Sequence, residues 1–197
     1  MTLEYFTSPE FRELASVSDY SDAAVEDAAA YIVAVIEREV GTSFIARTVT
    51  ERLAAGSATI RLNSPWVQSI TSVTLPSGAA LTVADIESTR AGVVPYPGGG
   101  VWPVDGDNDV VVTYVAGYST LATMPSDIKT AALYGTRARL MDTRDNAVFN
   151  ERLASQSNTD GGTTTFRLAD ADHPTGYATV DATIVAWRNK LKVFGFA

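Results

Sequence analysis

The sequence of 197 residues contains no cysteine, one histidine and three lysines. The absence of cysteine excludes disulfides, thiolate nucleophiles and cysteine-based metal clusters. Long apolar runs are also missing: the longest, residues 28–36, falls well short of the roughly 20 residues that a membrane-spanning helix needs. The first residues are acidic and lead into no long apolar run, so a secretory signal is not expected. The length suits one globular domain, or one domain with an appendage.

Residues with the chemistry of a catalytic site are scarce. The single histidine, His173, lies beside Asp170 and Asp172 in a segment that contains proline, and a lone histidine there is better explained as a solvated loop residue than as a base or metal ligand. A serine hydrolase would need this histidine, and no Gly-x-Ser-x-Gly motif surrounds any serine. The sequence therefore predicts no enzyme.

Two further motifs are incomplete. Residues 105–109 (Asp-Gly-Asp-Asn-Asp) resemble the first half of a calcium loop, but Val110 and Ala116 stand where the loop requires glycine and glutamate, so we interpret the segment as a polar turn. Residues 98–100 are three glycines without the Gly-Lys-Ser/Thr of a phosphate-binding loop, which favours a loop tip. The sequence predicts no cofactor and no metal.

Acidic residues are concentrated at the start of the chain. The net charge is −8, and residues 1–40 contain nine acids but only Arg12 and Arg38 as basic residues, whereas residues 182–197 contain three basic residues and no acid. An acidic first part of the chain argues against binding nucleic acid through its phosphates. Arginine, with twelve copies, outnumbers lysine, which suits directional pairing at protein interfaces.

The residues from Asp109 to Met141 are predicted to form a central strand followed by a helix. Residues 109–118 alternate as a buried strand does and end at Gly117, and residues 126–141 follow as a helix. The stripe of that helix consists mostly of small residues at helical spacing, which allows another helix to approach closely; it comprises Ile128, Ala131, Ala132, Gly135, Ala138 and Met141. Earlier helices are predicted over residues 8–15 and 21–40, the second capped by Ser21 and ended by Gly41.

Between these helices the pattern changes to strands. Residues 47–53 and 58–62 are predicted to form a hairpin around Gly56, followed by strands at 67–75 and, more weakly, 81–86. Residues 92–103, with four glycines and three prolines, are predicted to be a loop that carries Tyr96 and Trp102. Trp66 and Trp102 are interpreted as core or corner residues.

The end of the chain recovers an amphipathic pattern. Residues 155–165 are polar and without periodicity, which predicts a flexible connection. Apolar residues then recur at helical spacing, capped by Thr179; they are Val180, Ile184, Trp187, Leu191 and Phe194. The predicted fold is α+β: a helical bundle (core 1–153) with a small antiparallel sheet inserted at 44–115, and a flexible tether to a C-terminal amphipathic helix (154–197).

Five short motifs follow one another along the chain in an order that resembles a known protein family. They are Glu-Arg-Glu-Val-Gly-Thr-Ser-Phe at 37–44, Arg-Thr-Val-Thr-Glu at 47–51, Ile-Arg-Leu-Asn-Ser-Pro-Trp-Val-Gln-Ser-Ile-Thr-Ser-Val-Thr at 60–74, Val-Thr-Tyr-Val-Ala-Gly-Tyr at 112–118, and Met-Pro-Ser-Asp-Ile-Lys-Thr-Ala-Ala-Leu at 124–133. Over residues 21–144 the chain resembles the head–tail connector (adaptor) proteins of tailed bacteriophages, prophages and gene-transfer particles.

The resemblance implies a structural virion protein, made in the host bacterial cytoplasm and located in the neck. It implies a ring, commonly of twelve copies, that binds the portal on one side and the next neck or tail component on the other, while DNA passes through without specific binding and no membrane is involved. It also implies portal docking by the C-terminal segment, for which Trp187, Leu191, Phe194 and Phe196 are the candidates, although Trp187 fits a core position equally well.

An acidic wall suits a DNA channel, because it repels DNA and lets it slide. We therefore expect Glu26, Glu37 and Glu39 to face the channel. Two alternatives remain: another tail, neck or baseplate component, and a small-molecule or sugar-binding protein that uses Trp66, Tyr96 and Trp102.

Overall fold

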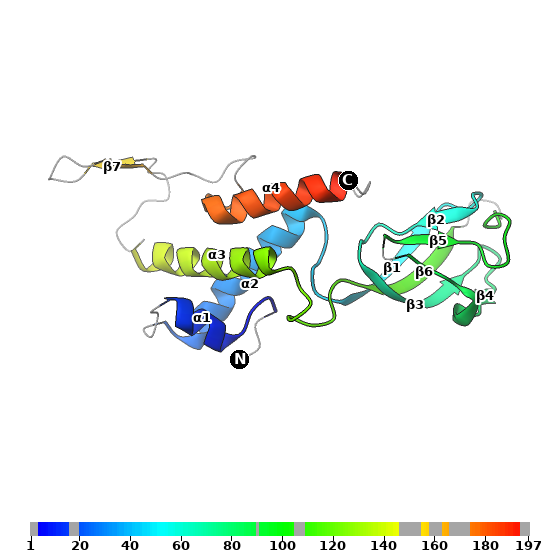
Figure 1. Ribbon diagram of the computed structural model, residues 1–197, viewed down its shortest axis with the longest axis horizontal. Helices are drawn as coiled ribbons and strands as arrows, with labels where there is room; N and C mark the ends of the chain where they lie inside the picture. Colours follow the sequence, from blue (N-terminus) through cyan, green and yellow to red (C-terminus); the bar gives the residue numbers. More distant parts are fainter. Residues whose placement is uncertain are drawn as a thin grey trace. The chain divides into compact units, whose positions relative to one another are not determined.

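The computed structural model describes residues 4–15, 20–89, 91–104, 109–145, 155–157, 163–165 and 174–193. The chain divides into two compact units, one of Met1–Gly41 with Met124–Lys190 and the other of Thr42–Thr123 with Leu191–Ala197. The first unit holds the helices, the last of which continues from Lys190 into the second unit, and the second unit holds the four-stranded sheet (Figure 1). The predicted α+β class, with a small antiparallel sheet inserted between helices, is confirmed.

Helix α1 (Ser8–Ala15) begins with two reciprocal hydrogen bonds. Glu10 N donates to Thr7 Oγ1 (3.4 Å), and Thr7 N donates to Glu10 Oε2 (2.6 Å), which is a capping box. The backbone N–H of Thr7, followed by its hydroxyl, which also donates to Glu10 Oε2 (2.8 Å), favours the charged carboxylate and so lowers the pKa of Glu10. The rings of Phe6 and Phe11 stack with centroids 5.8 Å apart, and both are buried.

Helix α2 (Asp22–Val40) has the predicted start and end. Ser21 Oγ accepts a hydrogen bond from Ala24 N (3.3 Å). Gly41 adopts φ 82°, which glycine accepts without strain, and its N–H donates to Glu37 O (2.8 Å). The apolar side of the helix is buried through Val25, Ala28, Ala29, Ile32, Val33, Val35, Ile36 and Val40.

Helix α3 (Ser126–Asp145) passes close to two other helices at Gly135. A β-carbon at Gly135 would lie 2.8 Å from Ile32 Cγ2 of α2 and 2.9 Å from Val180 Cγ2 of α4 (Ala178–Val193). Ile128, Ala131 and Ala132 are buried on the same side. The predicted small-residue stripe is thus confirmed as the contact within the chain's own bundle, except that Met141 at its end is 45% exposed.

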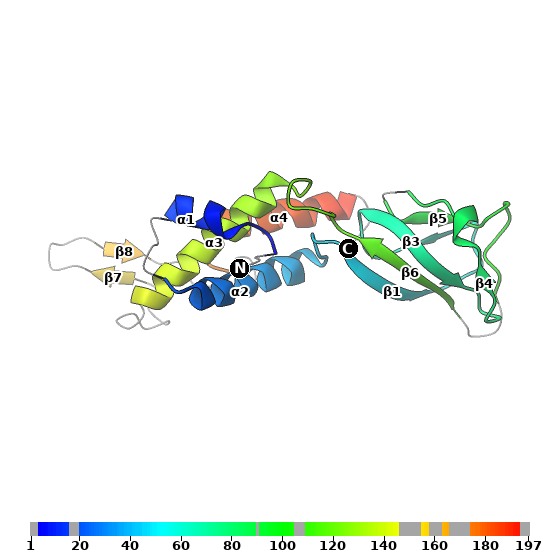
Figure 2. The same ribbon diagram turned by 90° about the horizontal axis from the view of Figure 1, so that it is seen from below.

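The main sheet of the second unit is antiparallel with the order β1-β6-β3-β4. Its strands are β1 (Arg47–Leu53), β6 (Val110–Ala116), β3 (Val67–Thr74) and β4 (Ala80–Leu81), which is followed by the 3-10 helix η1 (Val83–Asp85). Strands β2 (Thr59–Arg61) and β5 (Val93–Pro95) form a separate pair. Figure 2 shows β1, β6 and β3 side by side. Ile60 and Val94 of the small pair share one core with the main sheet.

Strand β6 lies at the centre of that core, as the alternation of its residues predicts. Val110, Val112 and Tyr114 are fully buried, while the residues between them are half-buried. After the strand, Gly117 has φ 110°, and a β-carbon there would lie 2.4 Å from Ile45 O. Only glycine fits this close approach of two backbones.

Three strand predictions are wrong. Residues 58–62 do not pair with 47–53: β1 pairs with β6, from Arg47 opposite Ala116 to Leu53 opposite Val110, and β2 pairs with β5. The strand predicted at 81–86 is only the two residues of β4 followed by η1. The loop predicted at 92–103 contains β5. In each case the local residues suit either state, and pairing with distant segments decides between them.

The segment before α4 also differs from the prediction. Strands β7 (Ser155–Ser157) and β8 (Thr163–Thr165) pair within the stretch that the sequence predicts as a flexible connection. The predicted cap Thr179 lies inside α4, which begins one residue earlier. The first turn is instead tied by Asp181, whose Oδ1 accepts hydrogen bonds from Thr175 N (3.0 Å) and Thr175 Oγ1 (2.6 Å).

Candidate assembly surfaces

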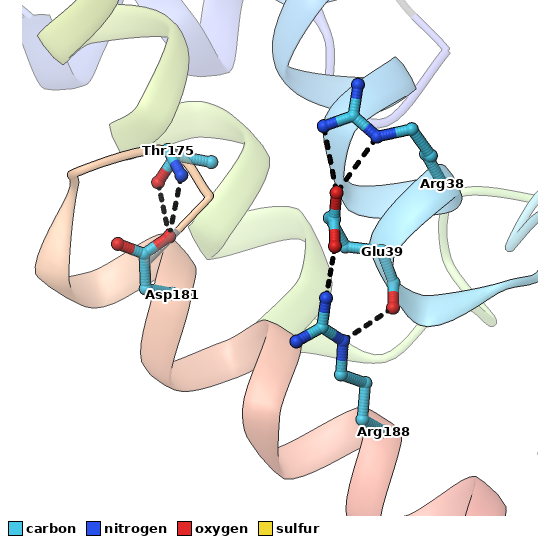
Figure 3. A network of polar contacts seen from close by, with 5 residues as sticks. All are labelled: Arg38, Glu39, Thr175, Asp181 and Arg188. Carbon is cyan, nitrogen blue, oxygen red and sulfur yellow. Dashed lines mark hydrogen bonds and ion pairs between the residues drawn. The ribbon is translucent and has the colours of Figure 1, made fainter. Parts of the chain in front are cut away.

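Helix α4 is held on α2 and α3 by specific polar contacts as well as by its apolar seam. Trp187 Nε1 donates to Asp127 Oδ2 at the start of α3 (3.0 Å). Arg188 Nε donates to the backbone oxygen of Glu39 on α2 (2.7 Å), and its guanidinium also forms an ion pair with the Glu39 carboxylate (Figure 3). These bonds fix both the rotation and the position of α4 along its axis.

Arg188 also satisfies the end of α2. The last carbonyl groups of a helix lack partners and carry partial negative charge, so a guanidinium bonded to one of them is favourable. The Glu39 carboxylate lies between two guanidinium groups, because Arg38 pairs with it at 2.8 Å on its other side (Figure 3). Glu39 is therefore a charge-neutralised element of the α2–α4 contact.

The predicted docking residues on α4 contact the chain itself. Trp187 is 7% exposed and Leu191 3% exposed, and Lys190 Nζ lies 4.0 Å from the centre of the Trp187 ring. Val180 and Ile184 of the same seam are fully buried. Phe194 and Phe196 lie outside the described residues. The seam of α4 is thus core in this chain, which the sequence left open for Trp187.

The three acids predicted to face a channel do not share one face of α2. Glu26 is exposed, whereas Glu37 accepts a hydrogen bond from the buried Tyr5 hydroxyl (2.7 Å) and Glu39 pairs with Arg188. Glu26 and Glu37 are three turns apart and lie on similar sides, but Glu39 is about 200° of rotation from Glu37. The exposed acid next to Glu26 is Asp27.

An open cavity of about 380 Å³ lies between α1 and α3. Its floor is apolar, because Phe6 and Leu133 are buried there, and Tyr134 stands beside them with 40% of its surface exposed. The charged residues that line it are Glu10, Glu13 and Lys129. We call this the α1–α3 groove. Sequence reasoning missed it, because it depends on how α1 packs against α3.

The aromatic residues of the sheet unit are structural. Trp102 is fully buried, and its Nε1 donates to Val94 O (3.2 Å). Trp66 stacks on Phe44, with ring centroids 5.2 Å apart, and its ring is tilted against that of Tyr118, with centroids 5.3 Å apart. This confirms the interpretation as core and corner residues and leaves Trp102 with no surface for a sugar.

A buried tyrosine links β6 to β1. The Tyr114 hydroxyl donates to Glu51 Oε1 (2.5 Å) and accepts from Ser64 N (3.2 Å), while Glu51 Oε2 accepts from Asn63 N (2.9 Å). Burial, together with the hydrogen bond to Glu51, raises the pKa of Tyr114 to about 12. The network ties the corner after β2 to the sheet and so positions a turn.

Among the described residues, no group of three histidine, cysteine or acidic side chains could hold a metal ion. His173 and residues 105–108 lie outside that part of the chain. No helix in the described ranges is long and apolar enough to cross a membrane.

Among known proteins, this chain matches solved structures only. No family model matches the sequence, and no curated protein matches it. Solved structures do match over nearly the whole chain. A chain in the neck of an empty gene transfer agent (GTA) particle, computed with C6 symmetry, is 16% identical with a TM-score of 0.61 and covers 95% of this chain and 92% of its own length.

Two further matches come from the same kind of particle. A chain in the neck of a native GTA particle, computed with C12 symmetry, is 17% identical with a TM-score of 0.58 and covers 95% of both chains. A chain in the virion of a native GTA particle is 16% identical with a TM-score of 0.60 and covers 93% of this chain and 89% of its own length. The fold is that of particle-neck proteins. The fold class implied by the resemblance to head–tail connectors is thereby confirmed.

Proposed function

We propose that this chain is a structural protein of the neck of a phage-like particle and is not an enzyme. The observation that carries the proposal is the match of fold over 95% of this chain and 92–95% of two chains from particle necks. A match that covers more than nine tenths of both compared chains includes the helical unit and the sheet unit together. A shared helix bundle or a shared sheet alone would cover much less.

We further propose a ring, commonly of twelve copies, that binds the portal above it and the next neck or tail component below it. The neck structures with C6 and C12 symmetry support a cyclic arrangement. Of the four predicted docking residues, we propose Phe194 and Phe196 for the portal contact, because Trp187 and Leu191 are buried within the chain.

The ring would surround DNA without binding its sequence. The exposed acids Glu26 and Asp27 on α2, in a chain of net charge −8, favour a wall that repels phosphates. Glu37, half-buried beside Tyr5, lies on a similar side of the helix and is the second of the predicted acids that suits this wall. Glu39 is proposed to act in the α4 contact instead. A ring reconstruction with Glu26 on its outer surface would overturn this assignment.

The experiment is a measurement of mass by light scattering, with negative-stain imaging, on the purified protein alone and with the portal of the same particle. We expect a ring of about a dozen copies, alone or on the portal. A monomer or dimer that ignores the portal would contradict the proposal. A tail or baseplate component would give an assembly with a different partner, and a sugar-binding protein is disfavoured by the burial of Trp102.

A further inference from the structure

A ring with cyclic symmetry above two needs two different, complementary surfaces on each subunit. This inference rests on the proposed ring and asks which surfaces those are. Helices α1, α3 and α4 offer two candidates, and they lie on opposite sides of α3. Gly135 faces α2 and α4, whereas Leu133, about 200° of rotation away, faces the α1–α3 groove. In Figure 1 α4 and α1 flank α3 on opposite sides.

The first surface is the α1–α3 groove. Its cavity of about 380 Å³ exceeds the volume of a single aliphatic side chain and is open along α3. Tyr134 (40% exposed) stands at its edge, and Met141 (45% exposed), two turns further on, continues the same face of α3. An apolar floor with a partly exposed aromatic edge is the kind of groove into which an amphipathic helix packs.

The second surface is the outer face of α4, opposite its buried seam. Val185 and Val193 are 42% and 85% exposed, and Asn189 and Lys192 lie with them. Spacings of four and three residues place Val185, Asn189 and Lys192 on one face, and Val193, eight residues after Val185, lies at the edge of that face. The side of α4 opposite its packed face therefore combines two exposed valines with a polar and a basic side chain.

The charges of the two surfaces are complementary. The groove carries Glu10 and Glu13 against the single Lys129. The second half of α4 contains Arg188, Lys190 and Lys192 and no acid; the first two pair with Glu39 and Asp127, while Lys192 is exposed and has no ion pair in the described part of the chain. A second copy of this chain therefore supplies an occupant whose exposed lysine complements the excess of acids at the groove.

We propose that the outer face of α4 of one copy docks in the α1–α3 groove of the next copy. Val185 and Val193 then cover the apolar floor beside Tyr134, and Lys192 approaches Glu13 at the rim. Because donor and acceptor surfaces differ and lie on opposite sides of the bundle, the contact is head-to-tail and repeats from copy to copy until the ring closes.

The absence of cysteine makes a direct test possible. We would make the full chain with Tyr134→Cys and Val185→Cys together, and assemble it under the conditions that give wild-type rings in negative stain. Mild oxidation, or a short bismaleimide, should then produce a ladder of covalent oligomers on a denaturing gel. Each single variant should give no ladder, and a mixture of the two single variants should stop at dimers.

The matched control pairs Val185→Cys with Ala30→Cys, an exposed position on α2 outside the groove. We expect at least about tenfold more cross-linked product from the groove pair, since docking raises the local concentration of the two thiols. Rings of the double variant without a ladder above the control would overturn the docking inference and leave the proposed function standing. Failure of wild-type protein to form any ring, alone or with the portal, would overturn both.

Discussion

The packing at Gly135 leads to a prediction in which two effects of opposite sign compete. In Gly135→Ala the new methyl group would lie within 3.0 Å of Ile32 Cγ2 and Val180 Cγ2. Alanine favours a helix interior over glycine by about 1 kcal/mol. Forcing an additional methyl into a packed core costs about 1–3 kcal/mol.

The steric cost should exceed the gain in helix propensity. Ile32 and Val180 are both fully buried, and β-branched side chains have few alternative rotamers in a helix, so neither methyl can turn away. We expect Gly135→Ala to lower the free energy of unfolding by about 1 kcal/mol and the melting temperature by about 2–4 °C. Without the steric conflict, the same substitution would raise both.

The measurement is urea unfolding followed by helical circular dichroism, on wild type, Gly135→Ala, Val180→Ala and the double variant. Because Val180→Ala removes the methyl that the new side chain meets, the two substitutions should couple favourably by at least about 0.5 kcal/mol. Ala34→Gly, at an exposed position of α2, calibrates the effect of glycine on helix propensity alone. A stabilised Gly135→Ala variant with no coupling to Val180 would refute the close helix crossing.

Two further substitutions test the polar contacts. Tyr114→Phe should cost about 1–3 kcal/mol, because it removes the hydroxyl that Glu51 Oε1 and the half-buried Ser64 N–H both contact. The pKa of Tyr114 is raised from 10.0 to about 12, so between these pH values the folded protein keeps a proton that the unfolded chain releases. The free energy of unfolding should therefore fall as the pH rises from 10 to 12. In thermal melts, Tyr114→Phe should lessen this fall. Arg188→Ala should cost about 1–2 kcal/mol in the same unfolding assay, since it removes a charge-assisted bond to the end of α2. Arg38→Ala, which removes the more exposed partner of Glu39, should cost less than about 0.5 kcal/mol, and equal effects would contradict the capping role of Arg188.

Elements with a regular period could be predicted from the sequence, whereas the strand partners could not. Helix α2 shows an apolar stripe between Ser21 and Gly41, and both ends follow from those two residues. A strand is also predicted at 67–75, where β3 forms, but which of its side chains are buried does not follow from regular alternation. Its buried residues Val67, Ile70 and Val73 are three apart, which no regular strand produces; two bulges against β6 each shift the register and bring all three to one face.

The pairing of β1 with β6 could not be predicted from the sequence, for a related reason. A turn at Gly56 favours a local hairpin, but seven consecutive residue pairs with β6 outweigh the few that β2 could offer. Strand β6 is more than fifty residues further along the chain, and no local signal specifies that contact. Prediction by nearest neighbours therefore places β1 correctly along the chain but pairs it with the wrong strand.

Contacts between distant segments also decide which face of α4 is available to a partner. The apolar spacing of α4 predicts a seam, but it does not say whether the seam is covered by this chain or by another protein. The contacts of Trp187 with Asp127 and of Arg188 with Glu39 settle that the seam is internal. A partner must then use what remains exposed on α4, and there the outer face carries Val185 and Lys192. Because the predicted face is buried, the surface that α4 can offer to a partner is the opposite one.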